Sequence, residues 1–476
     1  MRSARPTRRL AASAVAFAAL ATGLLAAAPA QADSQALPVV RLTALPTVAL
    51  PSAPATVQPN WSYRTNASSL NVDDAVISVD FSGLAHIAKV SFSDNCTVAG
   101  TVATCTEFLD YGAVSKGETF GSQIQMTLKA LKSAKLGTKG SYTVSGTSSE
   151  ATIVGRTGTV VVGGPALSLD QPPSQSGVAV GSTVSEPVRF TNSGDRPAPS
   201  VKVLLRASPG LVFATHYANC TYGTAGDPDV STDLALCTVA GPIQVGEVAE
   251  LADPVQLQVT QAALLTYLDI QTFAPGDATG LSGITWTQGS GDTLALTVID
   301  PGQSTTAPAG RFSTSFPDNE SNYQIASVQA DNTADFGVTG SSASAAAGAT
   351  ATFDFTGYAA GPATLFDRSG GELVPGVEVT PPPGTTVVSS SSNCQPWQQD
   401  NPDATAHGPY VCDFNSFLIP AGTTADFSLT VHVDTSTPGA QGSVALFSGP
   451  STGSPSPYTF PYDPNTANDT AVLALN

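Results

Sequence analysis

Six cysteines are the residues best suited to chemistry in this sequence, and they fall in three local pairs: Cys96 with Cys105, Cys220 with Cys237, and Cys394 with Cys412. A thiol pair can form a structural disulfide, act as a redox centre or bind a metal ion. The chain contains no C-x-x-C sequence, and His407 is the only histidine inside a cysteine loop. Structural disulfides are therefore the favoured interpretation, each worth about 3 kcal/mol in the chain-entropy estimate.

Catalytic and metal-binding motifs are weak elsewhere. Ser451 lies in a G-x-S-x-G sequence, but the Ser-Pro-Ser-Pro that follows cannot begin the helix that a nucleophile elbow needs. Carboxylates in Asp/Asn-rich turns could bind calcium, although ordinary turns are the favoured interpretation; they are Asp318, Glu320, Asp463 and Asp469. We expect no enzyme activity, no metal and no cofactor. A hydrolase with a dispersed Ser-His-Asp triad stays open, because triads are recognised by geometry.

Two groups of side chains could contact a ligand. Five of the seven lysines lie within one short stretch: Lys116, Lys129, Lys132, Lys135 and Lys139. They predict either a solvated strand edge, which is favoured, or a surface for an anionic wall polymer. Trp397, with Tyr410 nearby in the third cysteine loop, forms a possible ligand loop, and Trp286 is a further candidate. A buried core position is the commoner fate of such a tryptophan, whereas for Trp397, in a loop of polar residues, a buried and an exposed position are equally expected.

The elements that must position these residues repeat along the chain. Asparagine precedes the first cysteine of every pair, and a glycine follows the second cysteine nine to twelve residues later. An alternating run comes next in each copy, and period two predicts a half-buried β-strand. We therefore predict three homologous modules, each with its own disulfide. For residues 127–136, a strand through Lys129 is favoured over a helix.

This pattern resembles the conserved repeat known as domain of unknown function number eleven, which occurs in secreted and surface proteins of Gram-positive bacteria. The resemblance covers residues 178–476 well and residues 66–162 loosely, and an Ala-rich leader suits an actinobacterial source. It implies an immunoglobulin-like β-sandwich with a surface or secreted role. It implies no catalytic residues.

Composition shifts divide the chain. Residues 1–32 combine four arginines, an apolar stretch and Ala30-Gln31-Ala32, which predicts a cleaved signal peptide and a secreted protein, loosely wall-associated or released. Residues 33–60 are Pro-rich and predict a semi-extended linker. The sandwich modules then span 61–163 (module 1), 164–331 (module 2) and 332–476 (module 3). Module 2 is longer because residues 284–299 predict an inserted hairpin.

Charge is distributed unevenly among these all-β modules. Module 1 has eight acidic and eight basic residues, whereas modules 2 and 3 each carry a net charge of −11. Such an acidic chain argues against nucleic-acid binding. No segment after residue 32 reaches 18 consecutive apolar residues, so we expect no membrane span. The sequence therefore predicts a non-enzymatic, structural or adhesive modular protein whose partner is an envelope polymer or protein surface. The alternative is an accessory protein that binds carbohydrate or wall polymer.

Overall fold

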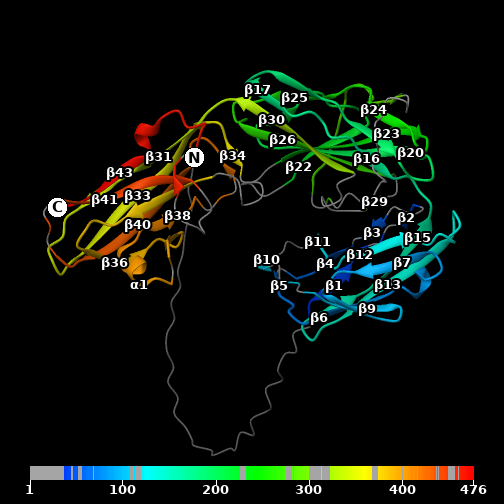
Figure 1. Ribbon diagram of the computed structural model, residues 1–476, viewed down its shortest axis with the longest axis horizontal. Coiled ribbons are helices and arrows are strands. Elements are labelled where there is room, and N and C mark those ends of the chain that lie inside the picture. Colours follow the sequence, from blue (N-terminus) through cyan, green and yellow to red (C-terminus); the bar gives the residue numbers. More distant parts are fainter. Residues whose placement is uncertain are drawn as a thin grey trace, which may run out of the picture. The chain divides into compact units, whose positions relative to one another are not determined.

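The computed structural model describes residues 37–43, 45, 47–51, 56–59, 61–67, 69–107, 109, 112–113, 119–225, 232–274, 281, 284–299, 312–313, 322–366, 374–398, 400–414, 416, 418–435, 437, 439–448, 456–458 and 460–476. These residues are almost entirely β-structure (Figure 1). The predicted signal peptide, Lys116, Asp318, Glu320 and Ser451 lie outside the described residues.

In its described residues, module 1 has fifteen strands and one short 3-10 helix. They are β1 (Val39–Leu42), β2 (Thr47–Leu50), β3 (Thr56–Gln58), β4 (Ser62–Thr65), β5 (Ser69–Leu70), β6 (Ala75–Asp80), η1 (Ser82–Leu84), β7 (Ala88–Phe92), β8 (Cys96–Ala99), β9 (Val102–Glu107), β10 (Gly112–Ala113), β11 (Thr119–Gly121), β12 (Met126–Ala130), β13 (Lys139–Thr147), β14 (Thr152–Val154) and β15 (Arg156–Val162).

The strands of module 2 are β16 (Leu167–Leu169), β17 (Gln175–Ala179), β18 (Thr183–Glu186), β19 (Arg189–Asn192), β20 (Ala198–Ala207), β21 (Leu211–Phe213), β22 (Cys220–Ala225), β23 (Thr232–Ile243), β24 (Val248–Leu251), β25 (Val255–Val259), β26 (Leu265–Phe273), β27 (Thr287–Gln288), β28 (Leu296–Ile299) and β30 (Tyr323–Asp331). β29 (Phe312–Ser313) lies in the same part of the sequence but pairs in parallel with β3 of module 1.

Module 3 contains β31 (Ala334–Thr339), β32 (Ser341–Ala343), β33 (Thr350–Pro362), β34 (Leu365–Phe366), β35 (Pro375–Thr380), β36 (Thr385–Ser390), β37 (Cys394–Pro396), α1 (Pro402–His407), β38 (Tyr410–Cys412), β39 (Leu418–Ile419), β40 (Thr424–Val433), β41 (Ala440–Ser448), β42 (Ser456–Pro457), η3 (Thr466–Asn468) and β43 (Thr470–Leu475).

One strand order recurs in all three modules. The larger sheet runs β2-β15-β13-β6-β9-β8 in module 1, β17-β30-β26-β20-β23-β22 in module 2 and β32-β43-β41-β35-β38-β37 in module 3. The facing sheet contains β3-β12-β7, β18-β25-β21 and β33-β40-β36 respectively. In every module the first strand of the larger sheet pairs in parallel with the last strand of the module. The modules are therefore tandem immunoglobulin-like β-sandwiches, and the predicted repeat is confirmed at the level of topology.

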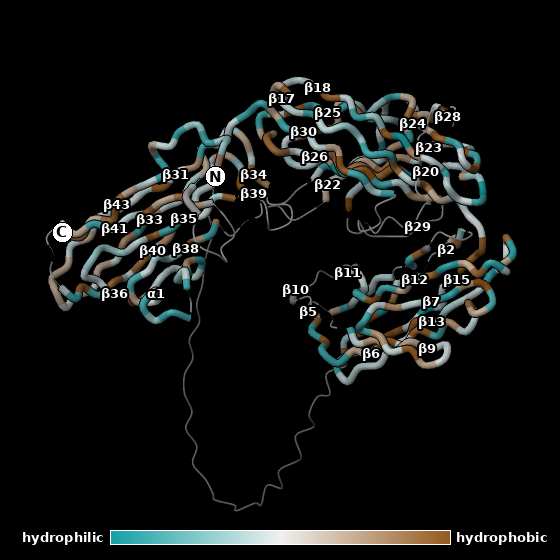
Figure 2. Tube along the Cα trace, in the orientation of Figure 1, coloured by the Kyte–Doolittle hydropathy of each residue, from teal (hydrophilic) through white to brown (hydrophobic). Residues whose placement is uncertain are grey.

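Each module encloses its own hydrophobic cluster, as period two requires. The strand predicted after each second cysteine is the central strand of the facing sheet, and its alternate side chains are buried: Met126 and Leu128 in β12, Val255 and Leu257 in β25, Phe427 and Leu429 in β40. Hydrophobic and hydrophilic segments alternate along these strands (Figure 2). Because β12 ends at Ala130, the favoured prediction of a strand through Lys129 is confirmed.

A positive backbone angle explains the glycine that precedes these strands in modules 2 and 3. Gly246 has a φ of 81° and Gly422 a φ of 87°, a conformation that residues with a side chain rarely adopt. No atom lies within 4 Å of where a Cβ would be at either position. The backbone conformation, and not crowding, therefore selects glycine at this turn.

The structure corrects the predicted linker at residues 33–60. β1 and β2 add to the sheets of module 1, with Val40, Leu42, Val48 and Leu50 fully buried or nearly so. The described prolines of this segment stand at strand ends, where a missing N–H breaks no ladder: Pro38 precedes β1, and Pro51 and Pro59 follow β2 and β3. The described part of this segment is a component of the sandwich.

The predicted inserted hairpin in module 2 is also wrong. β27 pairs with β22 in the larger sheet, whereas β28 pairs with β24 in a different sheet. The Gly-rich connection between them is held against other chain segments, because Gly289 N donates to Cys220 O at 2.9 Å and Gly291 N donates to His216 O at 2.7 Å. The segment adds one strand to each of two sheets, and this pairing stabilises the segment more than folding into an isolated hairpin would.

Candidate functional site

The three predicted disulfides are present, and each joins directly opposed residues of one hairpin: Cys96–Cys105, Cys220–Cys237 and Cys394–Cys412. Their Cα atoms are 4.0, 3.9 and 4.0 Å apart. This spacing is closer to the roughly 4.5 Å of a non-hydrogen-bonded pair of an antiparallel ladder than to the roughly 5.5 Å of a hydrogen-bonded pair. In every module the cross-linked hairpin is the outer pair of the six repeated strands of the larger sheet.

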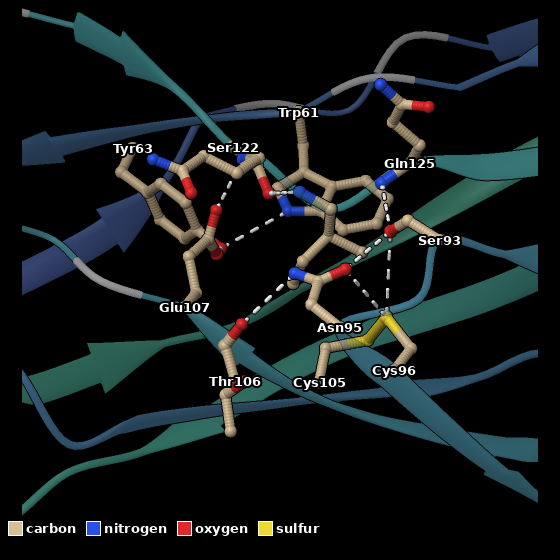
Figure 3. The surroundings of a disulfide bond; sticks show 12 residues. Trp61, Tyr63, Ser93, Asn95, Cys96, Cys105, Thr106, Glu107, Ser122 and Gln125 are labelled. Atoms are coloured by element: carbon tan, nitrogen blue, oxygen red, sulfur yellow. Dashed lines mark hydrogen bonds between the residues drawn. A yellow bond between two sulfur atoms is a disulfide. The ribbon is translucent and has the colours of Figure 1, made fainter.

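The asparagine before each first cysteine adds hydrogen bonds across the same hairpin, and Figure 3 shows this for Asn95 in module 1. The side-chain amide of Asn95 donates to Thr106 O at 3.1 Å, that of Asn219 to Thr238 O at 2.9 Å and that of Asn393 to Asp413 O at 3.2 Å. The main chain of the same acceptor residue donates back to the asparagine carbonyl in each module. We call this unit of asparagine and disulfide the Asn–Cys clamp, and it explains why the motif recurs.

Removing the clamp asparagine should lower the free energy of unfolding more in module 2 than in module 1. Asn219 also donates to Leu294 O and accepts from Leu294 N, at 2.9 and 2.8 Å, so it ties the bridging segment to the hairpin. We expect Asn219→Ala to lower the free energy of unfolding by about 2 kcal/mol and Asn95→Ala by about 1 kcal/mol. Urea unfolding followed by tryptophan fluorescence measures both, and equal losses would contradict the role assigned to the Leu294 contacts.

Beyond the common clamp, the three hairpins differ. In module 1 a short turn joins β8 to β9, and in module 2 the paired strands extend past the disulfide. In module 3 the loop contains α1, which begins after Asn401 because the Asn401 side chain accepts from Asp403 N at 3.0 Å. The sandwiches therefore hold three different loops at the same topological position.

The structure separates the two aromatic residues of the predicted ligand loop. Tyr410 is buried in the core of module 3, and its hydroxyl donates to Thr405 O at 2.6 Å, beneath α1. Trp397 is half-buried, and its backbone N donates to Pro409 O at 2.9 Å. Tyr410 therefore supports the loop from inside, while part of Trp397 stays accessible.

Four of the predicted lysines are exposed on module 1, within one short stretch of the sequence. Lys129 lies in β12, Lys132 and Lys135 lie in the connection after it, and Lys139 begins β13; all four are exposed. Lys89 in β7 is a fifth member, because it faces Lys129 directly across the ladder. It is not among the lysines predicted from the sequence. Lys89 and Lys129 are 40 positions apart in the sequence, and the pairing of β7 with β12 is the signal that would have revealed Lys89. We call these five residues the basic surface.

Within the described part of the chain, no ion pair neutralises a lysine of the basic surface. Arg189 and Glu250 form an ion pair elsewhere, at 3.0 Å in module 2. Lys89 and Lys129 oppose each other, and like charges placed directly across a ladder are unfavourable. This arrangement is one that an anionic ligand would relieve.

The calcium candidates Asp463 and Asp469 lie near enough to each other and to Asp335 for their charges to interact. Burial and the charges of Asp463 and Asp335 raise the pKa of Asp469 above its usual range. The oxygens of Asp463 are already engaged by Tyr458 Oη at 2.8 Å and by the backbone N–H groups of Phe336 and Asn465, both at 3.0 Å. No group of three or more potential metal ligands occurs in the described part of the chain.

The histidines make no hydrogen bond to a serine, threonine or cysteine side chain within the described ranges. His86 contacts Lys139 O, His407 contacts Thr385 O, and His432 contacts Asp434 Oδ1 at 2.9 Å. A nucleophile–base pair needs such a contact, or a geometry close to it. The described residues therefore bring together no Ser-His pair that could act on a substrate.

No protein-family model matches the chain, and no curated protein matches it in sequence. Solved structures match with little similarity. The C-terminal domain of the Streptococcus agalactiae AgI/II polypeptide BspA is 7% identical, with 65% of this chain and 100% of that chain covered and a TM-score of 0.19. A putative membrane-anchored protein of Corynebacterium diphtheriae is 8% identical, with 91% of both chains covered and a TM-score of 0.17. The Escherichia coli adhesin FdeC is 11% identical, with 92% and 96% covered and a TM-score of 0.17.

Scores this low carry no argument about function, and the fold assignment stands on the repeated strand order. Over the described residues, no helix has the length and apolarity to cross a membrane. The candidate binding features are therefore the three dissimilar hairpin loops fixed by the Asn–Cys clamp and the lysines of the basic surface.

Proposed function

We propose that this chain is a secreted, non-enzymatic modular protein with a structural or adhesive role at the cell envelope. The observation that carries the proposal is the conserved clamp combined with divergent loops. In all three sandwiches an asparagine and a disulfide fix the same hairpin, and the tip of that hairpin differs in each module. Rigid scaffolds with variable loops are a common way of presenting binding surfaces.

The compartment belongs to the same proposal. Disulfides persist in oxidising spaces, and all six cysteines of the chain are paired. Residues 1–32 have the pattern of a cleaved signal peptide. The sequence resemblance to repeats of domain of unknown function number eleven, with an actinobacterial source, is compatible with this location.

Co-sedimentation of the full chain with isolated cell envelopes and with protein-coated beads tests the proposal. We expect saturable binding to at least one of these surfaces, and no turnover of esterase, protease or glycosidase substrates. Retention should survive about 0.5 M salt if shaped loops make the contact, because salt screens exposed charges beyond a few ångströms at that strength. Turnover of any substrate, or no binding to any surface, would contradict the proposal.

A second candidate function is binding of an anionic wall polymer through the basic surface, and the unrelieved pairing of Lys89 with Lys129 favours it. Each lysine near an anionic surface contributes about 1 kcal/mol. Lys132→Gln should therefore weaken binding to a soluble polyphosphate about fivefold. Lys202→Gln in module 2 is the control and should change binding less than twofold. Equal effects of the two substitutions, or binding that does not weaken with salt, would exclude the basic surface as the site.

A further inference from the structure

A groove of about 490 Å³ opens on module 2 at its cross-linked hairpin. It lies where β21, the extended β22–β23 hairpin and the bridging segment around β27 meet. Its volume is in the range of protein ligand sites. Neither the basic surface nor the Trp397 loop contributes a residue to it. We call it the hairpin groove, and its lining residues include Phe213, His216, Tyr222, Asp233 and Gln288.

Aromatic rings form one wall of the hairpin groove. The ring of Tyr222 lies edge-to-face with His216, at a centroid distance of 4.3 Å, and with Phe213, at 5.9 Å. The only donor of the Tyr222 hydroxyl is used, because it donates to Thr215 O at 3.3 Å, and the same oxygen accepts from Tyr217 N at 2.8 Å. Tyr222 is thus locked in place and offers a ligand its ring rather than its hydroxyl.

Several hydrogen-bond donors around the groove are already used inside the protein. The side-chain amide of Gln288 donates to Ala218 O at 2.5 Å and to Cys220 O at 2.9 Å. The backbone N–H groups of Gly289 and Gly291 donate to the carbonyls of Cys220 and His216. These contacts fix the bridging segment, and they leave the Gln288 side-chain oxygen as an acceptor without a partner among the described residues.

Asp233 supplies the negative charge of the groove. Its carboxylate is half-buried and has no hydrogen bond or ion pair with any residue that the structure describes. Burial raises the pKa of Asp233, and the nearby charge of His216 partly opposes this effect. A buried, unpaired carboxylate gains most from a partner that brings both a positive charge and N–H donors.

Acceptors, a carboxylate and aromatic faces together select a particular ligand group. A guanidinium carries five N–H donors and no acceptor, stacks on aromatic rings and is less strongly hydrated than an ammonium. The amide donors of Gln288 and Gly289 are used inside the protein, which favours a ligand that brings its own N–H donors. The net charge of −11 on module 2 further favours a cationic partner.

We propose that the hairpin groove receives an arginine side chain of a protein partner, with the guanidinium against Asp233 and the Tyr222 ring. This inference rests on the proposed adhesive function and names a partner chemistry for it. Arginine and tyrosine are the residue types that most often anchor protein interfaces. The arginine here comes from the partner, and the tyrosine is held ready by module 2.

The test uses the full chain and a short capped peptide with one arginine between glycines, measured by isothermal titration. The comparison peptide replaces arginine with citrulline, which keeps the shape but removes the charge. Asp233→Asn removes the groove carboxylate at constant size, and Asp331→Asn removes an exposed acid at the end of β30 as a charge-matched control. Both variants should unfold at no lower urea concentration than the original chain.

We expect the arginine peptide to bind about tenfold more weakly to Asp233→Asn, and less than twofold more weakly to Asp331→Asn. The citrulline peptide should bind the original chain about tenfold more weakly than the arginine peptide does. On Asp233→Asn the two peptides should bind almost equally, because the guanidinium charge acts through the Asp233 carboxylate. The proposal would be overturned if both variants lost the same affinity for the arginine peptide, or if both peptides bound the original chain equally. It would also be overturned if no binding occurred at about 10 mM peptide. Binding of an uncharged oligosaccharide in its place, lost in Asp233→Asn, would also overturn it.

The envelope and bead assay separates this inference from the proposed function. Surface binding that persists in Asp233→Asn, together with no arginine-peptide binding, would reject the hairpin groove and leave adhesion standing. Arginine-peptide binding without retention on any surface would reject the adhesive role and leave the groove as a peptide site.

Discussion

Replacing both Cys220 and Cys237 with alanine is expected to lower the free energy of unfolding of module 2 by about 3 kcal/mol. The bridge spans 17 residues in sequence, and closing a loop of that size removes about this much free energy from the folding cost in the chain-entropy account. Both sulfur atoms lie in the core cluster of module 2, so the substitution also removes packing. The loss is a large share of what stabilises a single domain.

The three tryptophans make this measurement specific, because Trp61, Trp286 and Trp397 fall one to a module. A background with Trp61→Phe and Trp397→Phe leaves Trp286 as the reporter of module 2. Urea unfolding in this background should give the full loss for the Cys220/Cys237 double variant. The matched control, Cys96→Ala with Cys105→Ala, should leave the Trp286 transition unmoved, and a shift there would contradict independent modules.

Glu186 is expected to make module 2 less stable as the pH rises. It is fully buried in β18; Gln175 donates to one carboxylate oxygen, and the other has no partner. Burial raises the pKa of Glu186 from 4.5 to about 7, and the Gln175 hydrogen bond only partly opposes this. Between these two values the folded chain binds more protons than the unfolded chain, so stability falls with rising pH. The shift corresponds to about 3 kcal/mol lost between pH 4.5 and 8.

Glu186→Gln should remove this pH dependence, since glutamine keeps the oxygen that Gln175 binds and carries no charge. The quantity to measure is the difference in free energy of unfolding between pH 5 and pH 8, from the Trp286 transition. It should shrink by about 3 kcal/mol in Glu186→Gln and stay unchanged in Glu250→Gln, whose carboxylate is paired with Arg189 near the surface. An undiminished difference in Glu186→Gln would place the titration elsewhere.

The local features of the fold were readable from the sequence. The asparagine, the cysteine pair and the alternating run after them fix a hairpin and the central strand opposite it, and the structure contains all three copies. These features depend on residues close together in the chain, and period two makes a half-buried strand recognisable without its neighbours.

The errors and omissions come from pairing between distant segments. Residues 38–59 look like a linker because prolines dominate their composition, yet the strands between those prolines find partners in β14, β15 and β12. Lys89 joins the basic surface through a register that no local pattern encodes. Asp233, Tyr222 and Gln288 reach one groove from β23, β22 and β27, and Glu186 looks like an ordinary surface acid until its burial is known.

The central claim is that each of the three sandwiches fixes one hairpin with a disulfide inside the same module. Peptide mapping of the non-reduced full chain tests it most directly. Digestion and mass spectrometry should find the linked pairs Cys96–Cys105, Cys220–Cys237 and Cys394–Cys412, with no free thiol. A bridge between cysteines of different modules would contradict the repeated clamp and the independence of the modules.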